Sequence, residues 1–268
     1  MTRPRAGWRM LLGGSGPEGM DRRIVRRFVE LAGGAGDAHI VIVPTASEER
    51  TETIAHYLAA FELEGTRRVE VLDIRTHADA DLPMTAHGLR EATGVMFTGG
   101  DQLRLLDILS GTEFAAELRR RGRDGLVIGG SSAGSMALGD PVIVRGEPTA
   151  FYEHGAIRFA PGLGLVEGVT VDTHLVARGR LGRLVTIVAA YPDTIGVGIE
   201  EDCGLEVSPD GVATVIGEGV VCFVDGHGAD PAPAVAGRER ALSVSGLALH
   251  VLADGDSFDL RARRVWRA

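Results

Sequence analysis

Gly130, Ser132 and Gly134 form the pattern G-x-S-x-G directly after the apolar run at residues 126–128. Small flanking residues let the backbone turn sharply from a strand into a helix, and the turn exposes one hydroxyl beside free helix N–H groups. The pattern is also typical of an ordinary strand-to-helix turn. Ser132 is therefore a candidate nucleophile that needs partners elsewhere in the chain.

A serine nucleophile needs a base to take its proton and an acid to orient that base. His174 follows the apolar residues 168–172, and the carboxylates Glu200, Glu201 and Asp202 follow a second apolar stretch. Neighbouring strand residues point to opposite sides, so the pattern leaves open which carboxylate faces His174. The order Ser, His, acid differs from the order Ser, acid, His of α/β-hydrolases.

Two further motifs could assist such a nucleophile. In Gly99-Gly100-Asp101-Gln102, a glycine N–H could join that of Ala133 in an oxyanion hole, although the motif also fits a turn with Asp101 as a helix N-cap. Arg178, Arg180 and Arg183 lie at an expected helix start, where the helix dipole disfavours cations. Arginines at such a position indicate an anion to bind, such as a substrate carboxylate.

Apolar strands and helices alternate through the first half of the chain, which favours a parallel sheet covered on both faces. We expect strands at 8–12, 39–44, 69–74, 94–98 and 126–130, and helices at 21–32, 51–63, 103–109 and 112–121. In the second half we expect a helix at 181–190 and strands at 168–172, 194–199, 204–207, 213–216, 220–224 and 247–252, with a surface loop at 231–237. The polar strand ends should then meet at one rim of the sheet.

The composition and charge of the chain argue against several classes of protein. The 268 residues are 44% hydrophobic and 24% charged, and we expect one domain over residues 1–268. The net charge of -9 argues against a nucleic-acid partner. Apolar runs are too short for a membrane span or a signal-peptide core, so we expect a cytoplasmic protein. The two cysteines match no metal-ligand spacing, and we expect no metal or other cofactor.

Taken together, these motifs resemble the cyanophycinase and peptidase E family of serine peptidases, and the cyanophycinase branch in particular. The resemblance covers nearly the whole chain. It rests on Gly99-Gly100-Asp101-Gln102, Gly130-Ser131-Ser132-Ala133-Gly134, Asp172-Thr173-His174 with the three arginines, Gly198-Ile199-Glu200-Glu201-Asp202, and the C-terminal segments 249–252 and 258–260. It implies an α/β fold similar to class I glutamine amidotransferases, a flavodoxin-like three-layer sandwich.

The resemblance also implies roles for individual residues. Ser132 would be the nucleophile, His174 the base and Glu201 its orienting acid, while the N–H groups of Gly100 and Ala133 would form the oxyanion hole. Substrate would be held by Gln102, Asp172, Thr173, Arg178, Arg180 and Arg183. Such enzymes cleave cyanophycin, a polyaspartate with arginine on each side chain, into β-Asp-Arg dipeptides, and they are typically homodimers.

The chain departs from the family pattern at two places. Family members that degrade cyanophycin usually carry Gln where Thr173 stands, and they usually have Thr-Ala where Cys203-Gly204 follows Glu201-Asp202. These changes do not touch Ser132, His174 or Glu201, but they put cyanophycin as the substrate in question, and we carry two alternatives. One is a related serine exo- or dipeptidase acting on another aspartyl peptide or a specialised-metabolite precursor. The other is a binding module that kept the fold and lost catalysis.

Overall fold

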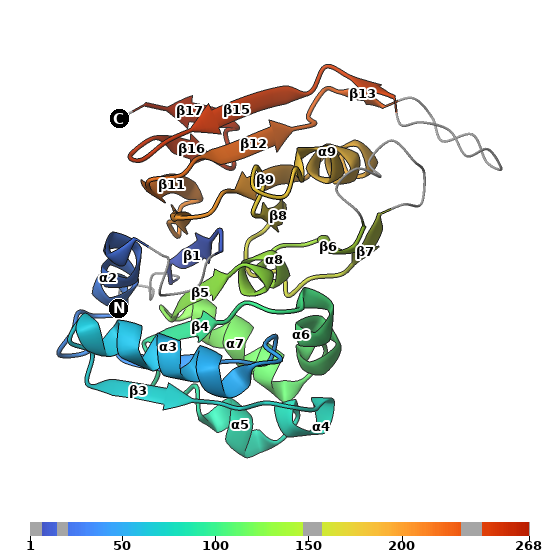
Figure 1. Ribbon diagram of the computed structural model, residues 1–268. Helices are drawn as coiled ribbons and strands as arrows, with labels where there is room; N and C mark the ends of the chain where they lie inside the picture. Colours follow the sequence, from blue (N-terminus) through green and yellow to red (C-terminus); the bar gives the residue numbers. More distant parts are fainter. Residues whose placement is uncertain (1–6, 15–20, 147–156, 232–242, 268) are drawn as a thin grey trace.

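A computed structural model describes residues 7–14, 21–146, 157–231 and 243–267, and its largest element is a nine-stranded sheet (Figure 1). The strand order is β17-β16-β11-β10-β1-β5-β4-β2-β3. Their bounds are β1 Arg9–Leu12, β2 His39–Val43, β3 Arg68–Val71, β4 Gly94–Phe97, β5 Val127–Ser131, β10 Cys203–Val207, β11 Val212–Gly217, β16 Ser257–Asp259 and β17 Arg264–Trp266. The five strands from β1 to β3 in this order run parallel, and the other four pair antiparallel.

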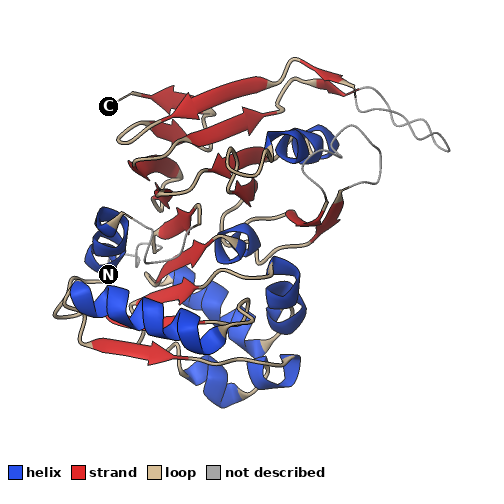
Figure 2. Ribbon diagram, in the orientation of Figure 1, coloured by secondary structure: helices blue, strands red, loops and turns tan. Residues whose placement is uncertain are grey.

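Helices cover both faces of the parallel strands, as the alternating apolar segments predict (Figure 2). Met10 and Leu12 face one buried cluster while Leu11 faces the other, because successive strand side chains point to opposite faces. Phe28 of α2 and Phe61 of α3 also belong to the first cluster. The helices of this half are α2 Arg22–Leu31, α3 Arg50–Leu63, α4 His77–Ala80, α5 Pro83–His87, α6 Gln102–Leu109, α7 Glu113–Arg123 and α8 Ala133–Leu138.

A separate four-stranded sheet has the order β15-β12-β9-β8. Its strands are β8 Val169–Thr173, β9 Ile195–Ile199, β12 Val221–Asp225 and β15 Ala248–Leu252, and the helix α9 Leu181–Ala190 packs on it. The expectation that all polar strand ends share the rim of one sheet is therefore wrong. Apolar runs indicate that a strand is buried, but they do not specify the partner with which it pairs.

The element types expected from the sequence are confirmed, and α9 has the expected bounds. The α/β class with a parallel-rich sheet between helices is also confirmed. Several short elements were not expected. They are the helices α4 and α5, the edge strands β16 and β17, and the pairs β6 Val142–Arg145 with β7 Arg158–Ala160 and β13 Asp230–Pro231 with β14 Val244–Ser245. The predicted loop at 231–237 falls almost entirely outside the described residues. In the described part of the chain, none of the helices has the length and apolar character needed to span a membrane.

Candidate active site

Ser132 lies at the sharp turn between β5 and α8. Its backbone has φ 51° and ψ −114°, a left-handed conformation that costs a non-glycine residue about 1–3 kcal/mol. The turn is held from both sides by close backbone packing. A Cβ on Gly130 would overlap the backbone of Gly134, and a Cβ on Gly134 would lie 2.5 Å from the carbonyl oxygen of Phe97. The two glycines of the G-x-S-x-G pattern are thus required by close backbone contact.

Ser135, a second serine of the same segment, links the start of α8 to the end of β1. Ser135 is fully buried, and its hydroxyl accepts a hydrogen bond of 2.7 Å from the N–H of Leu12. The same oxygen lies 2.5 Å from the carbonyl of Gly130. The N–H of Ser132 also donates to the carbonyl of Leu12, at 3.0 Å. The end of β1 therefore fixes both the start of α8 and the backbone of Ser132.

Ser132, His174 and Glu201 form a continuous chain of hydrogen bonds. The Ser132 Oγ lies 2.9 Å from His174 Nε2, and His174 Nδ1 lies 2.6 Å from Glu201 Oε1. Ser132 comes from the nine-stranded sheet, whereas His174 and Glu201 follow β8 and β9 of the four-stranded sheet. The three side chains have the spacing that a hydroxyl, a base and an orienting acid require.

His174 is held in a tight site between the two sheets. The residue is 5% exposed and has φ 53°. Gly14, which follows β1, faces the imidazole so closely that a Cβ there would overlap the ring. Burial lowers the pKa of His174, the hydrogen bond that its ring donates to Glu201 opposes this shift, and the charge of Arg178 adds to the lowering. At neutral pH the ring is therefore predominantly neutral and able to accept a proton.

The structure separates the three carboxylates that the sequence could not distinguish. Glu201 faces His174, whereas the carboxylate of Glu200 accepts hydrogen bonds from the N–H groups of Val176 and Ala177. The side chain of Glu200 thus braces the turn that follows His174. Asp202 is exposed. No pattern in the sequence indicates this bracing role, because it depends on the path of the 174–180 segment in space.

The polar residues around His174 divide into buried and exposed groups. Asp172 is fully buried and binds the Arg183 guanidinium through two hydrogen bonds of 2.5 and 2.6 Å. Arg180 donates to the carbonyl of Thr173 at 2.9 Å, and burial lowers its pKa to about 10. Arg178 is exposed. Asp172 and Arg183 therefore satisfy each other inside the protein, while Arg178 presents its charge to solvent beside the histidine.

The two departures from the family pattern lie close to this site. Thr173 is fully buried, and its hydroxyl is without a hydrogen-bond partner among the described residues. Cys203 is buried beneath the Glu200–Glu201 turn, where its thiol donates to the carbonyls of Glu200 and Val220 at 3.3 and 3.4 Å. Burial raises the pKa of the Cys203 thiol to about 12, so this cysteine is a poor nucleophile.

The motif at residues 99–102 lies beside the Ser132 turn. A Cβ on Gly99 would lie 3.5 Å from the Cβ of Ser132. Within the described structure, the N–H groups of Gly100 and Ala133 donate to no protein acceptor, so both are available to a ligand oxygen. Asp101 caps α6 as the alternative interpretation anticipated, and Gln102 donates from its side chain to the carbonyl of Ile143 at 2.8 Å.

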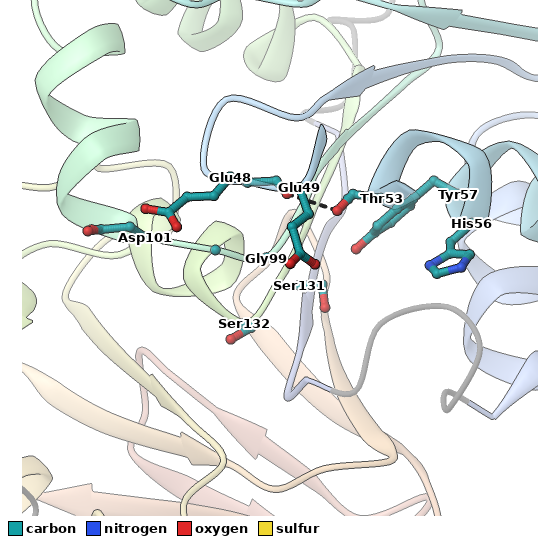
Figure 3. A pocket seen from close by; sticks show the side chains of 11 residues that line it. Glu48, Glu49, Thr53, His56, Tyr57, Gly99, Asp101, Ser131 and Ser132 are labelled. Carbon is teal, nitrogen blue, oxygen red and sulfur yellow. Dashed lines mark hydrogen bonds between the residues drawn. The ribbon is translucent and has the colours of Figure 1, made fainter. Parts of the chain in front are cut away.

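A pocket of about 490 Å³ opens beside Ser132, between the residues that follow β2 and β4 (Figure 3). Its lining includes Glu48, Glu49, Tyr57 and Asp101. Sequence reasoning missed the first three, because the 47–57 segment carries no recognisable motif. The feature that could have pointed to this segment is its position directly after β2, because sites in α/β proteins lie at the carboxyl ends of buried parallel strands. Among the described residues, no group of His, Cys, Asp and Glu has the arrangement needed to hold a metal ion.

Residues 10–215 match the model of peptidase family S51, and the chain belongs to that family. It is 38% identical over 261 residues to a cyanophycinase of Trichormus variabilis, and the aligned region covers 96% of this chain and 86% of the relative. A cyanophycinase of Geminocystis herdmanii is 32% identical over 263 residues, covering 95% of this chain and 94% of the relative. The similarity to cyanophycinases is therefore nearly full-length.

Solved structures show the same fold at lower sequence identity. A peptidase from an acI-B1 Actinobacterium has a TM-score of 0.73 at 21% identity and covers 96% of this chain and 98% of its own. A putative peptidase E from Listeria monocytogenes EGD-e has a TM-score of 0.55 at 18% identity, covering 80% of this chain and 98% of its own. Because the first structure covers 96% of this chain, the similarity in fold extends across almost the whole chain.

Proposed function

We propose that this chain is a serine peptidase that hydrolyses cyanophycin and releases β-Asp-Arg dipeptides. The observation that carries the proposal is the hydrogen-bonded series Ser132–His174–Glu201, with distances of 2.9 and 2.6 Å. Its nearly full-length similarity to cyanophycinases supports the choice of substrate. The intact series also argues against a binding module that has lost catalysis.

The mechanism follows from the positions of these groups. His174 Nε2 takes the proton of the Ser132 hydroxyl as the oxygen attacks the peptide carbonyl, and the carboxylate of Glu201 holds the Nδ1–H tautomer. The free N–H groups of Gly100 and Ala133 would stabilise the oxyanion that forms. The imidazolium then protonates the leaving amine, and water hydrolyses the ester on Ser132 by the same steps in reverse.

Substrate recognition would involve the arginines near His174. Arg178 is exposed and would contact a substrate carboxylate directly. Asp172 and Arg183 are buried against each other, so we assign them an indirect role in fixing the segment that carries Arg180. The buried hydroxyl of Thr173 and the side chain of Gln102 complete this set as candidate contacts.

The test is the turnover of cyanophycin by the purified protein, with products identified by mass spectrometry. We expect β-Asp-Arg release by the wild type and loss of at least ~10³-fold in kcat for Ser132→Ala. Ser110→Ala, at an exposed serine, is the matched control and should retain activity. Release from a different β-aspartyl or α-aspartyl dipeptide, with none from the polymer, would replace the substrate and keep the catalytic assignment. Equal rates for wild type and Ser132→Ala would overturn both.

We also propose that the protein forms a homodimer. The support is an apolar surface at sheet edges: Leu249 and Val251 on the edge strand β15 are 53% and 51% exposed, and Trp266 on β17 is 55% exposed. Large apolar side chains exposed on edge strands favour association. Sedimentation velocity of the wild type and of Val251→Asp would test this, with a dimer expected for the first and a monomer for the second.

A further inference from the structure

A second cleft, of about 450 Å³, lies at the end of β1 and β5 that is opposite to Ser132. Arg9 is the first residue of β1, whereas Ser132 directly follows the last residue of β5, which runs parallel to β1. The walls of the cleft come from the start of β1, the last turns of α7, the segment 164–168 before β8, the turn after β10 and the residues after β16. The cleft therefore lies between the nine-stranded sheet and the start of the strand that leads to His174.

The cleft is basic, although the protein has a net charge of -9. It is lined by one carboxylate, that of the exposed Glu167, and by four arginines, which are Arg9, Arg119, Arg123 and Arg261. In the ranges that the structure describes, none of the four forms an ion pair. Arg120, on the same helix but outside the cleft, forms ion pairs with two carboxylates. The positive charge of the cleft is thus not balanced within the described part of the protein.

Arg9 supplies a second, independent observation, because its guanidinium is largely buried without a carboxylate beside it. Its hydrogen bonds go to backbone carbonyls, those of Gly7, Trp8, Gly122, Leu126 and Leu165. Burial lowers the pKa of Arg9 to about 10, and no acidic group of the described chain opposes this shift. Carbonyl oxygens satisfy the N–H donors but carry no full charge, and a buried cation without a counter-charge is costly. An anion in the cleft would offset that cost.

The other three arginines have donors to spare. Arg119 uses its Nε to bind the carbonyl of Leu163 at 3.1 Å, which leaves its two terminal nitrogens. The side chains of Arg123 and Arg261 are exposed and form no hydrogen bond with another described residue. Arg119 and Arg123 are four residues apart on α7 and so share one face of the helix. Planar guanidinium groups of this kind bind oxyanions through paired hydrogen bonds.

From the unbalanced charge of Arg9 and the unused donors around it, we infer that this cleft binds a small, multiply charged phosphate, with Arg119, Arg123 and Arg261 as its direct partners. Its volume is in the range of small-molecule sites. Because the segment 164–168 continues into β8, a bound phosphate would join α7 to the sheet that carries His174. Binding would therefore stabilise the docking of the two sheets on which the Ser132–His174 contact depends.

The test is the binding of pyrophosphate to the purified protein at low salt, measured by isothermal titration calorimetry and by the change in Tm. We expect one site per chain and a rise in Tm of about 3 °C or more at ten times Kd. Arg123→Gln/Arg261→Gln should weaken binding by at least about tenfold, and the fold should persist because both side chains are exposed. Arg67→Gln/Arg90→Gln is the matched control. It removes the same charge at exposed positions outside the cleft and should keep the wild-type affinity.

Three results would overturn the inference. The first is a wild-type protein that neither binds millimolar pyrophosphate nor gains thermal stability from it. The second is equal weakening in the two double variants, which would show a response to net charge alone. The third is loss of binding in Arg178→Gln with none in Arg123→Gln/Arg261→Gln, which would place the anion beside His174. None of these results changes the proposed function, because the cleft lies at the end of the sheet opposite to Ser132.

Discussion

The two halves of the candidate active site are positioned by different kinds of contact. On the nine-stranded sheet, Ser132 is fixed by backbone packing: Gly130 against Gly134, and its own N–H on the carbonyl of Leu12. On the four-stranded sheet, His174 is fixed by side chains, with Glu201 on its ring and Glu200 on the turn that follows it. Close packing of backbone leaves no room for a methyl group, whereas hydrogen bonds can be weakened gradually.

Because of this difference, substitutions near Ser132 should mainly lower the stability of the fold, whereas substitutions near His174 should mainly lower the catalytic rate. Changes to the glycines of the Ser132 turn should reduce the stability of the fold, because nothing nearby can move aside. Changes to the carboxylates near His174 should leave the fold in place, because both side chains are partly exposed, and should act through the position or tautomer of the imidazole. Gly14 belongs to both halves, because it closely follows β1 and also faces the imidazole ring.

Glu201→Gln should have the largest effect on rate. An amide in place of the carboxylate permits the wrong imidazole tautomer, so we expect kcat to fall on the order of 10³–10⁴-fold with little change in Tm. Glu200→Gln is the matched control: its amide oxygen can still accept from Val176 and Ala177, and we expect a fall of about tenfold or less. Equal losses in the two variants would show that the two glutamates do not have separate roles.

Gly130→Ala should have the next largest effect, on stability. The added Cβ would overlap the backbone of Gly134, and we expect a loss of about 2–4 kcal/mol in the free energy of unfolding. Denaturant unfolding of the variant measures this directly. Gly36→Ala is the control, because its Cβ would meet no atom within 4 Å. A stable, fully active Gly130→Ala protein would show that the Ser132 turn is not held by backbone packing.

Arg178→Gln should have the smallest effect, a change in the pH profile. His174 must be neutral to act as the base, so kcat/KM rises with pH through the pKa of the free enzyme. The positive charge of Arg178 lowers that pKa, and removing it should move the acidic limb to higher pH at low salt. Arg123→Gln makes the same charge change at an exposed position in α7 and should not move the limb. A shift to lower pH would contradict the assignment of His174 as the base.

Much of this site could be predicted from local patterns. Ser132 was found because a short apolar strand runs directly into small residues, and His174 because it follows another apolar strand. The pairing of β8 and β9 in a second sheet could not be predicted, since each strand is buried on both faces and carries no signal for its neighbour. Nor could the pocket residues Glu49 and Tyr57, which come together only through the fold.

The roles of Glu200 and Glu201 show most clearly what cannot be predicted from the sequence. The two side chains are chemically identical and adjacent, so no sequence pattern separates them. Their difference arises from the turn at residues 200–202, which directs one carboxylate to the imidazole and the other to the backbone of the 176–177 segment. Only the path of the chain in space supplies that information.

The central claim is that two sheets bring Ser132, His174 and Glu201 into one working triad. The rate at which a fluorophosphonate modifies the protein tests it most directly, with the modified residue located by mass spectrometry. We predict a single adduct on Ser132 and a rate at least ~100-fold lower in His174→Ala, because the base activates the hydroxyl. An adduct on another residue, or an unchanged rate without His174, would contradict the claim.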